Sequence, residues 1–166
     1  MTRTFLAGCA LAGLVVALAG CGGSSKSSAA EQQVQKEAAI YQIDQIERTW
    51  HEATSTQNVN LMMSLFAPGA VFNIGGETFT GKAQIKRFWE TAGPFEPGHH
   101  WQSDTPTYKI KTTVNGDKGT LYFECDYIDP TSQKVVAVVA VDHNVQKING
   151  KWLIVDSSGA PGSIKP

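Results

Sequence analysis

Residues 108–156 read YKIKTTVNGDKGTLYFECDYIDPTSQKVVAVVAVDHNVQKINGKWLIVD, and this stretch decides the fold class. Turn sequences interrupt it at 115–119, 129–130 and 149–150. Asn-Gly between two hydrophobic runs is a strong signal for a tight hairpin. The stretch therefore predicts antiparallel strands at 108–114, 120–128, 134–148 and 151–156.

Helical periodicity precedes these strands. From about Glu31 to residue 55, apolar residues recur at spacings of three and four on one predicted face: Ala39, Ile43, Ile46, Trp50 and Ala53. A short second helix follows from Asn58 through Phe66, and a third spans 82–92, with a strand at 70–74 between them. Helices followed by an antiparallel meander predict an α+β fold, with the helices packed on one face of a curved sheet.

The N-terminus carries a targeting signal. Arg3 is followed by an uncharged run over 5–20, which is shorter than the roughly 20 residues of a membrane span. The run ends in Leu18-Ala19-Gly20-Cys21, which resembles a bacterial lipobox. That resemblance implies cleavage before Cys21, acylation of this cysteine, and a protein exported and lipid-anchored on the extracytoplasmic face of a bacterial membrane. A signal-anchor helix is the disfavoured alternative, because the run is short.

The expected domain limits follow from this signal. They are a lipoprotein signal peptide at 1–20, the lipidated Cys and a flexible Gly/Ser tether at 21–32, a folded domain at 33–160 and a tail at 161–166. Cys9 is then removed with the signal peptide, so Cys125 is the one remaining free thiol. No internal disulfide and no Cys-based metal cluster is expected.

The composition excludes several classes of function. The chain has 166 residues with 14 Lys+Arg against 15 Asp+Glu, so no basic field is available for nucleic acid. No phosphate-binding loop, nucleophile elbow or metal motif occurs, and we expect neither a cofactor nor a metal.

Specific segments suggest a family. Trp50, Asn58, the run LFAPGAVF at 65–72, Gly81-Lys82 ahead of a helix, and the closing Asn-Gly-Lys-Trp hairpin resemble the SnoaL-like branch of the nuclear transport factor 2-like superfamily. The resemblance covers roughly residues 36 to 157. It implies a cone, in which a strongly bent sheet wraps a long N-terminal helix and encloses an apolar cavity. The superfamily includes ketosteroid isomerase, scytalone dehydratase, polyketide cyclases and association domains, so it implies no single reaction.

The cone would be lined by a set of large, mostly apolar residues. We expect ligand-binding positions at Trp50, Met62, Phe72, Asn73, Phe88 and Trp101. Each of these residue types is also common in an ordinary packed core.

One carboxylate is a candidate for chemistry. Asp142 follows Val135–Val141, seven consecutive apolar residues that predict a strand covered on both faces. Burial there would raise its pKa and keep it protonated. By resemblance it matches the ketosteroid isomerase acid, but the base and Tyr positions of that enzyme fall on Asn73 and Trp50, which disfavours its mechanism.

Histidines supply the other candidates. His100, or His51, could form an acid–base set with Asp142, whereas the adjacent pair His99-His100 makes a poor chelate. Cys125 is expected on the apolar face of its strand as an inert hydrophobe.

Three functions remain open. The first is a lipid-anchored module that binds a small apolar or amphipathic molecule. The second is a homodimeric assembly domain that pairs through the outer sheet face, where Tyr122, Glu124 and Asp126 would lie. The third is a cofactor-independent isomerase, cyclase or dehydratase using Asp142.

Overall fold

The computed structural model describes residues 28–91, 95, 98 and 100–162, with the backbone alone for 160–162. The helices are α1 (Ala29–Ser55), α2 (Val59–Met63), α3 (Gly81–Thr91) and the 3₁₀ turn η2 (Thr107–Lys109). The strands are β1 (Phe66–Ile74), β2 (Glu77–Thr80), β3 (Gln102–Asp104), β4 (Lys111–Asn115), β5 (Lys118–Asp129), β6 (Lys134–Ile148) and β7 (Lys151–Gly162). The predicted signal peptide and the predicted lipidation site Cys21 lie outside the described residues.

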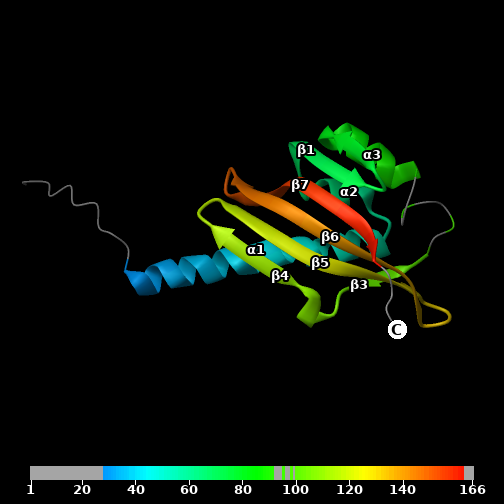
Figure 1. Ribbon diagram of the computed structural model, residues 1–166, viewed down its shortest axis with the longest axis horizontal. Helices are drawn as coiled ribbons and strands as arrows, with labels where there is room; N and C mark the ends of the chain where they lie inside the picture. The colour runs from blue at the N-terminus through cyan, green and yellow to red at the C-terminus, as the bar shows by residue number, and fades with distance from the viewer. Residues whose placement is uncertain (1–27, 92–94, 96–97, 99, 163–166) are drawn as a thin grey trace, which may run out of the picture.

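The described strands form one curved sheet with the order β2-β1-β7-β6-β5-β3, and β4 pairs with β5 (Figure 1). Only β1 and β7 run parallel, and the other described pairs are antiparallel. The inner face of the sheet carries the helices, because inner side chains such as Phe72 and Phe123 pack against rings of α1 and α3. This arrangement confirms the expected α+β fold.

Two long hairpins build the centre of the sheet. β6 has the predicted bounds of 134–148. It turns into β7 through Asn149 and Gly150, whose φ angles of 51° and 80° suit a primed turn. β5, β6 and β7 are long enough to bend over α1, which positions their inner side chains around one core.

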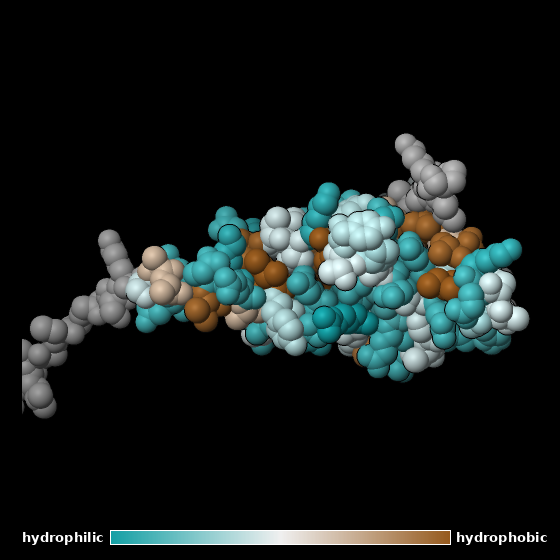
Figure 2. Space-filling model, turned by 90° about the horizontal axis from the view of Figure 1, so that it is seen from below, coloured by the Kyte–Doolittle hydropathy of each residue, from teal (hydrophilic) through white to brown (hydrophobic). Residues whose placement is uncertain are grey.

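α1 crosses the inner face and buries the predicted stripe. Ile43, Ile46, Trp50 and Ala53 are each at most 4% exposed. The helix begins with a capping box, in which Ser28 and Glu31 bond reciprocally. Its first turns are exposed and extend beyond the sheet, as Figures 1 and 2 show. The helix therefore starts inside the segment 21–32 that was expected to be a flexible tether.

Several predicted boundaries were wrong for identifiable reasons. α2 ends at Met63 instead of Phe66, because the Leu65 carbonyl accepts the Ile154 amide and draws Phe66 into β1. β4 starts at Lys111 instead of residue 108, because η2 precedes it. β7 continues past Asp156, because β1 and β6 both pair with it as far as Gly159.

The expectation that both faces of 135–141 are covered was also wrong. Val135 and Val136 are 42% and 46% exposed. The described helices cover only the inner face, so the outer face of β6 is partly open. Among the described residues, no helix is long and apolar enough to cross a membrane.

Candidate ligand-binding cavity

An apolar cavity of about 150 Å³ lies between α1, α3 and the inner face of the sheet. Aromatic and aliphatic side chains dominate its wall: Trp50, Phe72, Ile74, Phe88, Trp89, Trp101, Cys125, Tyr127, Ala137, Val139 and Val141. Strand periodicity explains the set, because residues two apart on β1 and on β6 face the same side. No charged side chain is part of this lining.

The structure places four of the six expected lining residues at the cavity: Trp50, Phe72, Phe88 and Trp101. The other two lie elsewhere. Met62 is fully buried in the core but does not reach the cavity wall. Asn73 is also not part of the wall, and its side chain accepts a hydrogen bond from Thr78 at 2.7 Å. Its neighbours Phe72 and Ile74 take the inner face, so Asn73 lies on the outer one.

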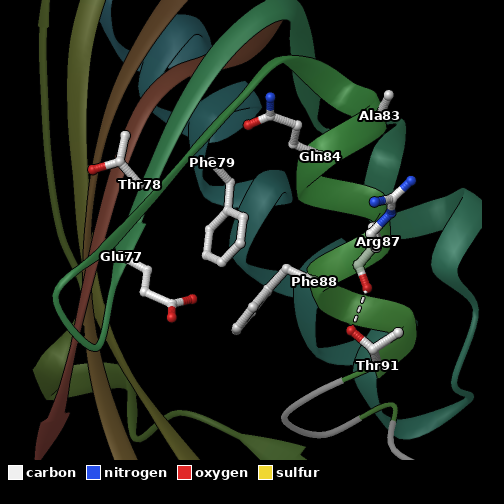
Figure 3. Close-up of a pocket in the computed structure, with 8 residues that line it drawn as sticks. All are labelled: Glu77, Thr78, Phe79, Ala83, Gln84, Arg87, Phe88 and Thr91. Carbon is white, nitrogen blue, oxygen red and sulfur yellow. Dashed lines mark hydrogen bonds between the residues drawn. The ribbon is translucent and has the colours of Figure 1, made fainter.

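Phe88 separates this cavity from an open groove between β2 and α3. In Figure 3, Phe79 and Phe88 form the floor of the groove, and Glu77 and Arg87 lie at its edges. The two phenyl rings are 4.9 Å apart, and Phe88 also packs against Phe72 at 5.4 Å. A single aromatic side chain therefore lines both spaces.

The titratable groups of the cavity wall are neutral. Burial raises the pKa of the Cys125 thiol to about 12, although hydrogen bonding to Tyr127 and Ser103 opposes this rise. Burial likewise raises the pKa of Tyr127 well above its usual value. Cys125 is 0% exposed, which confirms the prediction that this thiol is buried on the apolar face of its strand.

A polar cluster outside the cavity joins α1 to β3. His51 Nδ1 lies 2.6 Å from Ser103 Oγ, and Nε2 lies 2.7 Å from Thr105 Oγ1 and 3.1 Å from Glu47 Oε1. Thr105 donates its hydroxyl proton to the Glu124 carbonyl, so it accepts from Nε2–H. The other ring nitrogen of His51, Nδ1, shares a hydrogen bond with the Ser103 hydroxyl.

Sequence reasoning missed this cluster, because Glu47 falls off the apolar stripe of α1. It is 6% exposed. The spacing of four between Glu47 and His51 is the one signal that could have indicated the pair. None of the four residues lines the cavity, so the cluster connects α1 to β3 and is not part of the cavity wall.

The expected position of Asp142 was wrong. Asp142 is exposed, and it lies between Tyr122 and Ser158 on the outer face of the sheet. The inner position belongs to the next residue, His143, which is 2% exposed. Its environment lowers the pKa of His143 to about 3, because burial disfavours the charged form.

The predicted acid–base sets are not brought together. His51 pairs with Glu47 on the inner side, whereas Asp142 is on the outer one. His100 is exposed and is not among the cavity-lining residues, and His99 lies outside the described residues. Within the described part of the chain, no three His, Cys, Asp or Glu residues are grouped to hold a metal ion.

Comparison with known proteins agrees with this architecture. The SnoaL-like domain family matches residues 48–153. A nuclear transport factor 2-like protein with a cystatin-like fold from Novosphingobium aromaticivorans is similar, with a TM-score of 0.70 at 13% identity, over 86% of this chain and 94% of that one.

Two further solved structures are also similar. LinA matches with a TM-score of 0.67 at 12% identity, over 81% of this chain and 92% of LinA. A candidate dehydratase of the nuclear transport factor 2-like family from Streptomyces avermitilis matches with a TM-score of 0.63 at 12% identity, over 76% and 97%. No curated protein sequence matches the chain.

A curved sheet that wraps a long helix around an apolar cavity defines a protein of the nuclear transport factor 2-like class. Within that class, the chain belongs to the SnoaL-like domain family, as its sequence resemblance predicted. This family contains ligand-binding proteins and isomerase- or dehydratase-type enzymes.

Proposed function

We propose that this protein is a membrane-anchored lipoprotein whose cone-shaped domain binds one small, uncharged, largely apolar molecule. The observation that supports this proposal is the partly open apolar cavity of about 150 Å³ with its aromatic lining. Apolar cavities of about this size stay dry and take up molecules as small as benzene. The volume therefore favours a single-ring compound over a steroid-sized one.

The chemistry of the lining supports an uncharged ligand. Transfer of an ion out of water is costly unless an opposite charge meets it, and the lining has no charged side chain. Cys125 and Tyr127 keep their protons at neutral pH, because burial raises both pKa values. Neither is a base there, which supports binding over a proton-transfer reaction.

Binding of toluene to the full chain tests the proposal. Val139→Phe places a ring in the cavity, whereas Val138→Phe places the same ring on the outer face of β6 and serves as the matched control. We expect Val139→Phe to weaken toluene binding at least tenfold in calorimetry, and Val138→Phe to leave it within about twofold. Equal binding by both variants would place the ligand elsewhere, and absence of binding to the parent chain contradicts the proposal.

Membrane anchoring through Cys21 is supported by the lipobox resemblance of Leu18-Ala19-Gly20-Cys21. We expect the protein, expressed in a bacterial host, to sediment with membranes and to carry acyl chains on its first mature residue. Cys21→Ser should abolish acylation, whereas Cys125→Ser, which alters the other cysteine of the mature chain, should not. Mass spectrometry of the N-terminal peptide measures this directly, and an unmodified Cys21 refutes the anchor.

Assembly is a second candidate function, favoured by the exposed valines of β6. We propose that this outer face forms the interface of a homodimer.

A further inference from the structure

Two polar side chains on the inner face of the sheet are enclosed without hydrogen-bond partners. His143 is 2% exposed and Ser157 is 0% exposed. Among the described residues, neither ring nitrogen of His143 nor the hydroxyl of Ser157 has a partner. A buried polar group without a hydrogen-bond partner destabilises the folded state. Two such groups side by side therefore indicate a role other than packing.

The two residues belong to one site. They lie directly opposite each other on β6 and β7. Directly opposed side chains have Cβ atoms about 5 Å apart, so a single small polar group can contact both. Together they offer donors and acceptors, because a neutral imidazole has one of each and a hydroxyl can act as either.

His143 and Ser157 do not line the cavity themselves, but they lie next to residues that do. The imidazole ring of His143 is 5.1 Å from the Trp50 ring, and Ser157 is opposite Phe72. Val141 precedes His143 by two residues on the same face of β6. Trp50, Phe72 and Val141 all line the cavity.

Trp50 lies between the pair and the cavity, because its ring packs against His143 at 5.1 Å and also lines the cavity wall. The indole interacts in addition with Cys125 and Tyr127, two other residues of that wall. A turn of the indole would join the cavity to His143 and Ser157.

We propose that His143 and Ser157 form the polar end of the ligand site and bind the hydroxyl group of a small phenol or cyclic alcohol whose ring fills the cavity. This inference rests on the proposed ligand-binding function. A hydroxyl donates one hydrogen bond and accepts others, which matches what the pair offers. The ligand's hydroxyl stays protonated, because His143 is neutral and no charged side chain lines the cavity to balance an anion.

The test compares p-cresol with toluene, which differ by one hydroxyl, on the full chain. We expect the parent protein to bind p-cresol at least tenfold more tightly than toluene in calorimetry. His143→Leu and Ser157→Ala should each weaken p-cresol binding toward the toluene value and leave toluene binding within about twofold. His100→Leu, which changes an exposed histidine, is the control and should alter neither.

The outcomes separate the two proposals. Toluene binding with no preference for p-cresol would overturn the polar site and leave the cavity intact as a ligand site. Absence of binding by both compounds would overturn both proposals. Both substitutions replace an unpaired polar group by an apolar one, so the variants are expected to fold. In the parent protein, the ¹⁵N resonances of His143 should shift with p-cresol and not with toluene, and an unshifted spectrum contradicts the contact.

Discussion

At the scale of single residues, His143 makes the stability of the protein depend on pH. Its pKa in the folded state is lowered to about 3 by burial, whereas an unfolded histidine titrates near 6.5. Below pH 6.5 the unfolded chain therefore binds a proton that the folded chain does not. The free energy of unfolding then falls by about 1.4 kcal/mol per pH unit as the pH drops toward 3.

This prediction can be checked by urea unfolding at pH 7 and pH 5. Over that range His143 should remove about 2 kcal/mol from the free energy of unfolding. In the His143→Leu variant this part of the loss should be absent, while all other titrating groups remain. The same pH dependence in parent and variant would show that the imidazole is not held neutral.

His143 also shows what the sequence could not settle at this scale. Seven consecutive apolar residues precede Asp142, so no alternation indicates which face of β6 is inner. A shift of one residue in the assignment of inner and outer positions moves every side chain of the strand to the opposite face of the sheet. Asp142 was therefore expected at the buried position, which belongs to His143. In β5 the alternation is visible, and the prediction that Cys125 faces inward and Glu124 outward was correct.

At the scale of secondary-structure elements, Gly119 determines how closely α1 approaches the sheet. A Cβ atom at this position would lie 2.5 Å from the Thr113 carbonyl oxygen and 3.0 Å from Ile43 Cδ1. The first contact is with backbone, which cannot move aside without distorting the β4–β5 pair. Glycine is thus required here by close approach.

Gly119→Ala should accordingly lower the free energy of unfolding by about 1–3 kcal/mol through overpacking. Gly69→Ala is the matched control, because a Cβ there meets nothing within 4 Å and its φ is not positive. It should change stability by at most about 0.5 kcal/mol. Chemical denaturation of the two variants measures the difference, and equal effects would refute the close approach.

The elements themselves were largely readable from local signals. Apolar spacing predicted the buried face of α1, and the Asn149–Gly150 turn fixed the end of β6. β3 and the late half of β7 were missed because neither has a strong pattern of its own. Both are strands because of their partners, β5 for the one and β1 with β6 for the other.

At the scale of the whole molecule, large hydrophobic side chains of the described chain are exposed on α1, on η2, where Tyr108 lies, and on β6. Figure 2 shows a largely hydrophilic face with brown patches toward each end. The exposed large hydrophobic residues of the described chain include Val34 and Tyr41 on α1 and Val135 and Val136 on β6. The resemblance to SnoaL-like proteins predicted the cone-shaped fold. That fold alone does not indicate which exposed surface of the molecule a partner would cover.

The outer face of the sheet is the surface that we expect to form a homodimer. Val136 is 46% exposed, and the half-buried Val138 lies two residues later on β6. Nearby on β5, one carboxylate oxygen of Asp126 is enclosed without a partner among the described residues, and burial raises the pKa of this group. A two-fold axis near β6 would place Val136 and Val138 of one subunit against the same two residues of the other subunit, as an isologous interface requires.

Val136→Glu should therefore dissociate the dimer, because two like charges would face each other across the axis. Val34→Glu is the matched control: it introduces the same charge at another exposed valine, on α1 and away from the sheet. It should leave the dimer intact. Sedimentation of the full chain carrying Cys21→Ser, so that lipid does not drive association, measures the mass of each species. A parent chain that sediments as a monomer at tens of micromolar would exclude the interface. Loss of the dimer in the Val34→Glu variant alone would move the interface to α1.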